Sequence, residues 1–110
     1  MYCLVFYVPE TSIESVKEAL FAKGAGRYEQ YDCCAWQVLG EGQFRPLAGS
    51  QPFLGKIDEV EKVPEYRVEM ICEDAIIFDV VEALIEAHPY EEPAYHVWQI
   101  KTIEDLRKND

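Results

Sequence analysis

The chain has 110 residues, of which 49% are apolar, and its formal net charge is −11 because 21 acidic residues outnumber 10 basic ones. This length suits one domain, residues 1–110, and the apolar content is that of an ordinary globule. The negative charge disfavours binding to nucleic acid or anionic lipid. No apolar run reaches the ~20 residues that span a membrane, and no basic leader begins the chain, so we expect no membrane contact and a cytoplasmic location.

The first third of the chain predicts a strand, a helix and a second strand. Residues 4–8 form a continuous apolar run, which is typical of a central strand. Apolar residues recur at helical spacing from Ile13, and Gly24 and Gly26 predict the end of a helix of about 12 residues. Residues 28–39 are rich in aromatic side chains, cysteine and valine, which predicts the second strand.

Glycine and proline punctuate residues 40–60, which predicts an irregular ribbon of short extended pieces and turns. The extended pieces are expected at residues 43–47 and 56–60. Residues 40–46 resemble a phosphate-binding loop only superficially, because they lack the required glycine spacing and no capped helix follows them. A hairpin turn is the plainer interpretation. Long ordered connections of this kind are often functional.

The rest of the chain predicts a third strand, a second helix and a last strand. Residues 65–72 alternate, with Tyr66, Val68, Met70 and Cys72 on one face and Glu65, Arg67, Glu69 and Ile71 on the other, as in a half-buried strand with one polar face. Asp74 is a candidate cap for a helix whose apolar stripe covers residues 77–85. Residues 95–100 predict the final strand, and residues 103–108 a short terminal helix.

This order of elements predicts an α+β fold, the ferredoxin-like (split βαβ) sandwich. We expect an antiparallel sheet with two helices on one face, and an extra ribbon between the second and third main strands. The other face of the sheet carries Arg67 and Glu69 together with apolar side chains. A half-apolar open face on so small a domain predicts self-association.

Residues 88–95 join the second helix to the last strand and concentrate the chemistry of the chain: one imidazole, two carboxylates, two phenols and two prolines. The negative end of the helix dipole favours an imidazolium at His88. We interpret His88 either as a helix cap that fixes this corner, which the rigid prolines favour, or as a metal ligand or proton carrier. Glu91 and Glu92 are adjacent, and in an extended segment they would point to opposite sides and not form a catalytic pair.

A metal site is the second hypothesis from the residues, with His88, His96, Cys33 and Cys34 as candidate ligands. Thiolate and imidazole ligands suit copper(I) or zinc, whereas no Cys-x-x-Cys spacing supports a structural zinc knuckle. Adjacent cysteines converge on one metal only if the backbone bends there. The alternative interpretation is that the cysteines are reduced, buried hydrophobes.

Several stretches appear together in a combination that no single motif would define: residues 24–26, 31–34, 40–46, 52–55, 60–63, 67–69 and 88–95. Together they resemble the inserted domain of the YqfO-type members of the Nif-three-like family, a dinuclear-metal or GTP cyclohydrolase type 2-like group. The resemblance covers residues 2–100. The His-Pro-Tyr-Glu piece at 88–91 also resembles the CutA divalent-ion tolerance proteins. Both groups are similar in fold to the PII signalling proteins, which are ferredoxin-like and typically trimeric.

The resemblance implies a stand-alone PII/CutA-like domain. The dinuclear metal ligands of full-length members lie in flanking domains, so it assigns no catalytic residue to this chain. We expect a non-enzymatic, self-associating regulatory or ligand-sensing module, with a trimer favoured over a dimer and a ligand or protein partner at a subunit boundary. Binding of a divalent or soft metal ion is the alternative, and a metal-dependent hydrolase is the least favoured. The residues expected to shape the boundary are His88, Pro89, Tyr90, Glu91, Glu92, Pro93, Tyr95, Phe44, Arg45 and Pro46.

Overall fold

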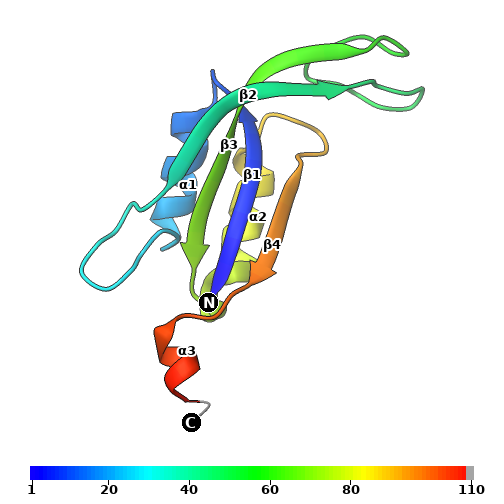
Figure 1. Ribbon diagram of the computed structural model, residues 1–110. Helices are drawn as coiled ribbons and strands as arrows, with labels where there is room; N and C mark the ends of the chain where they lie inside the picture. Colours follow the sequence, from blue (N-terminus) through cyan, green and yellow to red (C-terminus); the bar gives the residue numbers. More distant parts are fainter. Residues whose placement is uncertain (109–110) are drawn as a thin grey trace.

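The computed structural model describes residues 1–108 as one four-stranded antiparallel sheet with helices (Figure 1). The strand order is β2-β3-β1-β4. This order and the two strand-helix-strand halves confirm the ferredoxin-like class. Along the chain the elements are β1 (Tyr2–Pro9), α1 (Ile13–Ala22), β2 (Trp36–Phe44), β3 (Glu61–Cys72), the 3-10 helix η1 (Asp74–Ile76), α2 (Ile77–Ala87), β4 (Tyr95–Gln99) and α3 (Ile103–Arg107).

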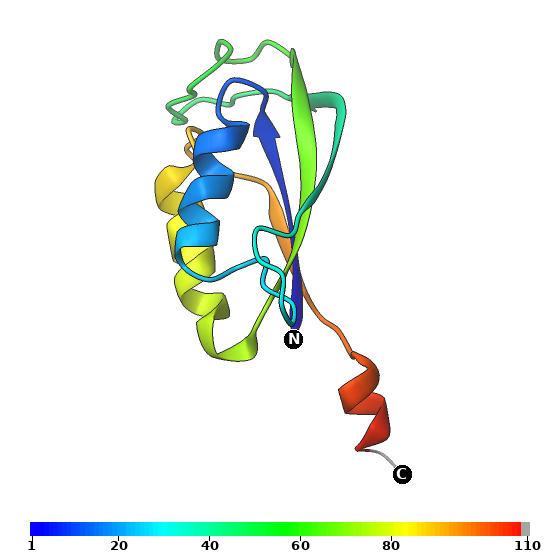
Figure 2. The ribbon, with the colours of Figure 1, turned by 90° about the vertical axis from the view of Figure 1, so that its left-hand side faces the viewer.

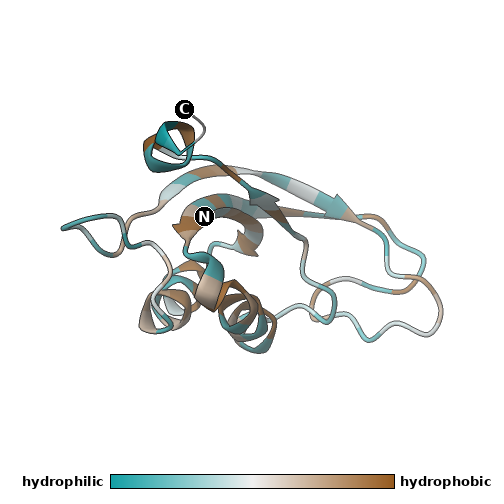
Figure 3. Ribbon diagram, turned by 90° about the horizontal axis from the view of Figure 1, so that it is seen from below, coloured by the Kyte–Doolittle hydropathy of each residue, from teal (hydrophilic) through white to brown (hydrophobic). Residues whose placement is uncertain are grey.

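The molecule has two layers, because α1 and α2 cover the same face of the sheet and leave the opposite face uncovered (Figures 2 and 3). Helix α3 lies beyond the end of β4, on the side of the uncovered face, and stands away from the body. Within residues 1–108, no helix combines the length and the apolar content that crossing a membrane requires.

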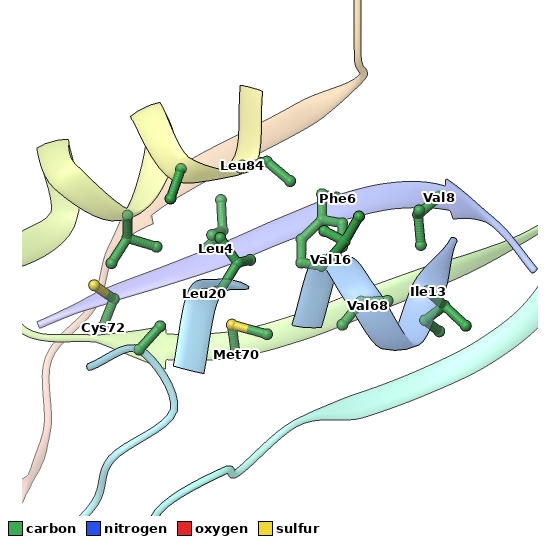
Figure 4. Packing of buried hydrophobic residues seen from close by; sticks show 13 residues of the cluster. Leu4, Phe6, Val8, Ile13, Val16, Leu20, Val68, Met70, Cys72 and Leu84 are labelled. Atoms are coloured by element: carbon green, nitrogen blue, oxygen red, sulfur yellow. The ribbon is translucent and has the colours of Figure 1, made fainter. Parts of the chain in front are cut away.

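The core lies between the sheet and the two helices (Figure 4). Side chains alternate along a strand, so every second residue of β1 points toward the helices. Leu20 of α1 and Leu84 of α2 meet these side chains from the helix layer. The buried cluster comprises Leu4, Phe6, Val8, Ile13, Val16, Leu20, Ala25, Val68, Met70, Cys72, Val80, Ala83 and Leu84.

The link from α1 to β2 depends on glycine at its tightest point. Gly26 has φ +77°, which L side chains rarely adopt, and its N–H donates to the carbonyl of Ile71 at 2.8 Å. A Cβ there would lie 2.7 Å from the carbonyl oxygen of Cys34. The glycine stop expected after the first helix is confirmed at Gly24, which follows the C-cap Lys23 with φ +98° and donates its N–H to the carbonyl of Phe21 at 2.9 Å.

The second strand begins later than the sequence predicts. Residues 28–35 form a turn rather than a strand, with Tyr28 and Tyr31 paired by two backbone hydrogen bonds of 2.9 Å. Glu29 and Cys33 adopt left-handed backbone angles, φ 53° and 55°, which a strand does not accommodate. The aromatic and cysteine content of this stretch is typical of strands but does not reveal these local turns.

The hairpin turn expected at residues 40–46 is also absent, because β2 continues through residues 40–44 and ends at Phe44. Residues 40–44 pair with residues 61–65 of β3 and form a two-stranded ribbon that extends beyond β1 (Figure 1). The extended pieces expected at 43–47 and 56–60 are not separate strands, since residues 45–60 form the irregular loop at the tip of the ribbon. The predicted ribbon therefore exists, with a longer paired stem.

The ribbon and α3 make the molecule elongated. The radius of gyration is 15.8 Å and the extents are 54 × 26 × 23 Å. A compact chain of this length has a radius of gyration of about 13 Å. The two projecting elements therefore expose more surface than a monomeric fold of this size requires.

Replacement of Leu20 by alanine tests the core. Leu20 is fully buried, so we expect Leu20→Ala to lower the free energy of unfolding by about 2–5 kcal/mol in urea denaturation. The matched control is Phe78→Ala on α2, whose side chain is 72% exposed, with an expected change within about 0.5 kcal/mol. Equal effects of the two substitutions would contradict this packing.

Candidate functional site

A cavity of about 420 Å³ lies where the loop at the tip of the ribbon meets the corner formed by residues 88–95. These two segments are far apart in the sequence, and both were expected to shape a functional boundary. The structure brings them together at one end of the sheet. The lining residues are Tyr7, Gln43, Phe44, Arg45, Pro46, Leu47, Ser50, Pro52, Phe53, Leu54, Glu65, Tyr90, Glu91, Glu92 and Ala94.

Two kinds of contact join the loop to the corner. The backbone N–H of Gln51 donates to Oε1 of Glu91 at 3.1 Å. The ring of Tyr90 packs between the loop and the ribbon, with centroid distances of 5.9 Å to Phe44 and 6.2 Å to Phe53. Tyr90 is therefore the side chain around which the cavity wall is assembled.

His88 lies beside Tyr90 and fixes the conformation of the corner through hydrogen bonds. It is buried at the C-terminal end of α2, where its backbone N–H donates to the carbonyl of Leu84 at 2.9 Å. Its ring joins two other elements: Nε2 lies 2.6 Å from the carbonyl oxygen of Tyr7 in β1, and Nδ1 accepts the backbone N–H of Tyr90 at 3.1 Å. Only the neutral imidazole with hydrogen on Nε2 satisfies both contacts.

The imidazolium that the helix dipole favours at His88 is therefore not what the structure supports. Burial lowers the pKa of His88, and the hydrogen bond to Tyr7 offsets only part of this effect. A proton on Nδ1 would also face the N–H of Tyr90, donor against donor. Desolvation outweighs the dipole because the ring is almost fully buried.

The polar groups of the cavity wall lie in an apolar environment. Burial raises the pKa of Glu65, whose carboxylate lies over Gly42 on the ribbon. Burial also raises the pKa of Tyr90, and the carboxylates of Glu65 and Glu61 raise it further. The Tyr90 hydroxyl is buried and has no hydrogen-bond partner among residues 1–108.

The cavity wall carries three carboxylates and one guanidinium, from Glu65, Glu91, Glu92 and Arg45. Glu91 and Glu92 both reach the wall, although an extended segment would separate them. Residues 89–92 are bent rather than extended, which explains the difference.

The four candidate metal ligands do not meet. Cys33 and Cys34 lie in the turn before β2, and His96 lies in β4. The register places Trp36, two residues after Cys34, three strand spacings of about 4.8 Å from His96. Both ring nitrogens of His88 are already engaged. Within the described part of the chain, no group of three or more histidine, cysteine, aspartate or glutamate side chains is placed to hold a metal ion.

The cysteines differ in their surroundings. Cys72 is buried in the core, and burial raises its pKa to about 11, so its thiol is protonated and inert. Cys33, in contrast, is exposed in the turn, although a buried role was expected for it. All four thiols are free.

The uncovered face of the sheet, here the open face, is lined with aromatic side chains from three strands. Trp36 is 58% exposed and Trp98 is 47% exposed. His96 packs its ring edge-on against Tyr7 at 6.2 Å and lies 5.6 Å from the ring of Trp98. By the register, the open face includes Cys3, Val5, Tyr7, Trp36, Val38, Glu65, Arg67, Glu69, Ile71, His96 and Trp98.

Glu65 and Phe53 are the site residues that the sequence did not single out. Glu65 belongs to the polar set of the third predicted strand, and its alternation there was the available signal. Phe53 is a single aromatic residue in a loop. The only sequence signal for it is that residues 52–55 belong to the stretches that resemble the family. Neither signal shows which distant segment the side chain meets.

Comparison with known proteins agrees with the fold and with the motifs. No family model matches the chain. The chain is 41% identical over 100 residues to the GTP cyclohydrolase 1 type 2 homolog of Halalkalibacterium halodurans, covering 91% of this chain and 27% of that protein. A Bacillus cereus protein related to NIF3 superposes with a TM-score of 0.79 at 35% identity, over 92% of this chain and 26% of that one. CutA1 from Pyrococcus horikoshii superposes with a TM-score of 0.69 at 18% identity, over 98% and 92% of the two chains.

The fold is therefore that of the CutA and PII-like proteins. The sequence relationship is to the Nif-three-like family, and the chain corresponds to a CutA-like domain of that family. The chain spans about a quarter of the length of the Halalkalibacterium halodurans and Bacillus cereus proteins. The family resemblance that the motifs indicate is confirmed.

The pH dependence of stability tests the His88 network. Below pH ~6.5 the unfolded chain binds a proton on His88, whereas the folded chain resists it because its pKa is lowered. Stability is therefore lost as pH falls through 6.5 toward the lower folded pKa. We expect urea denaturation between pH 7.5 and 5 to show this loss, and His88→Gln to reduce its slope.

His96→Gln is the matched control, because it removes the other histidine and keeps the His88 ring in place. The slope should persist in this variant. If the free energy of unfolding depends on pH as steeply in His88→Gln as in the unmodified chain, the neutral imidazole of His88 is not the group that titrates.

Proposed function

We propose that the chain is a non-enzymatic, self-associating module of the CutA/PII type that senses a ligand in the cytoplasm. The observation that carries self-association is the open face, where Trp36, Val38 and Trp98 are exposed on a sheet surface that no helix covers. Large exposed apolar side chains on an uncovered sheet face of a small domain are typical of an interaction site. A trimer is the form that the PII resemblance favours, with a dimer as the alternative.

The projecting elements support the same proposal. Helix α3 exposes Ile103 and Leu106, and it stands on the side of the open face. A five-residue helix is too short to be stable without packing. A second copy seated on the open face would give these side chains a surface to pack against.

The cavity supports ligand sensing. It lies between the ribbon loop and the corner, and the contacts between these two segments are few: one hydrogen bond from Gln51 to Glu91 and the rings around Tyr90. A ligand in this cavity would touch both segments. Binding there would change how the ribbon sits relative to the sheet, which is how we propose that the signal is passed to partner subunits or proteins.

The name of the relatives raises a second function, the cyclohydrolase reaction on GTP. The charge of the cavity argues against it, because three carboxylates outnumber the one guanidinium and their excess negative charge would repel a triphosphate. We therefore expect GTP incubated with this chain and added Zn²⁺ or Mg²⁺ to remain intact by liquid chromatography. Turnover that depends on the protein and survives in an independent preparation would favour the hydrolase instead.

Native mass spectrometry tests self-association. We expect an oligomer of defined size at micromolar concentration, with a trimer favoured. Trp36→Gln combined with Trp98→Gln removes the two largest exposed side chains of the open face, so this variant should dissociate to monomers while its circular dichroism is unchanged.

Phe78→Gln is the matched control, because Phe78 is an exposed aromatic residue on the helix layer, away from the open face. It should keep the oligomer. A monomeric parent chain, or an oligomer that only Phe78→Gln disrupts, would refute assembly through the open face.

A further inference from the structure

We infer that the cavity binds an organic cation with an alkylated ammonium group, held against three aromatic rings and the carboxylate of Glu65. This inference rests on the proposed ligand-sensing function and names the chemical class of its ligand.

The aromatic rings give the first reason. Phe44 comes from the end of β2, Phe53 from the loop and Tyr90 from the corner, and all three line the cavity. Phe44 and Phe53 are tilted by 51° and 47° to the ring of Tyr90. The face of each ring carries negative electrostatic potential, so a cation seated in the cavity against these rings would be attracted to them.

The charge of the wall gives the second reason. Glu65 takes part in none of the ion pairs within residues 1–108, and it lies on an apolar wall that desolvates it. A carboxylate so placed lacks a cation, and a cationic ligand would supply one. Glu91 and Glu92 add negative charge and Arg45 is the one basic side chain of the wall, and all three residues are exposed.

The size of the cavity gives the third reason. It is within the size range of small-molecule sites, which are mostly apolar with a few polar groups. A ligand with an apolar body and a cationic head would satisfy these features.

The test compares choline with 3,3-dimethylbutan-1-ol, a neutral molecule of the same shape, by NMR titration of the 110-residue chain. The backbone amides of Gln51 and Tyr90 are the reporters, because both donate hydrogen bonds at the cavity. We expect choline to bind about tenfold more tightly or better, since the two probes differ in charge and not in size.

Three substitutions locate the site. Glu65→Gln and Phe53→Leu should each weaken choline binding by about three- to tenfold. Gly42→Ala keeps every charge, but its Cβ would overlap the Glu65 carboxylate and displace it, so it should also weaken binding. Glu82→Gln and Phe78→Leu, exposed on α2, are the matched controls and should leave binding unchanged.

The outcomes separate the ligand class from the proposed function. Equal binding of both probes, with sensitivity to Phe53→Leu, overturns the cation assignment and leaves a sensing cavity in place. No binding of either probe by a correctly assembled oligomer overturns the inference, while self-association stands on its own test. Binding of choline that all five variants retain also overturns it, because the cation would then sit elsewhere.

Discussion

The neutral imidazole of His88 is the interaction on which the site depends. It ends α2, donates to the backbone of β1 at Tyr7 and accepts from the backbone of Tyr90, so one side chain ties a helix, a strand and the corner together. Both contacts are shielded from water, and a buried polar group that lost either partner would be left unsatisfied. The corner therefore has one stable conformation, and Tyr90 is presented toward the ribbon.

Once Tyr90 is fixed, the cavity wall follows from packing. Phe44 and Phe53 contact it from the ribbon and from the loop, and Glu91 accepts the N–H of Gln51. These contacts are sparse compared with the core under α1 and α2. Few buried contacts mean low local stability, so the loop can move while the core under α1 and α2 stays folded.

Much of the fold could be predicted from the sequence, because alternation and helical spacing report directly on which faces are buried. The core strands, both long helices and the short terminal helix lie where these patterns place them. The errors occur where conformation depends on single residues: Cys33 and Glu29 have left-handed backbones, and a glycine-rich stretch proved to be a paired strand.

For the site, the motifs predicted the corner and the start of the loop. The contact between the corner and the loop could not be predicted, because it depends on where the tip of the ribbon folds back. The roles of Glu65 and Phe53 follow from that contact.

Tyr7 links the two surfaces that carry the proposed function. Its carbonyl receives the hydrogen bond of His88, its side chain lines the cavity, and its ring packs against His96 on the open face. The cavity and the open face therefore have Tyr7 in common, and no further residues are needed to connect the two surfaces. A ligand that shifts Tyr90 acts on His88, and His88 is bonded to the same peptide that carries the Tyr7 ring. In the module proposed above, Tyr7 is therefore a residue through which a ligand in the cavity would contact the open face directly.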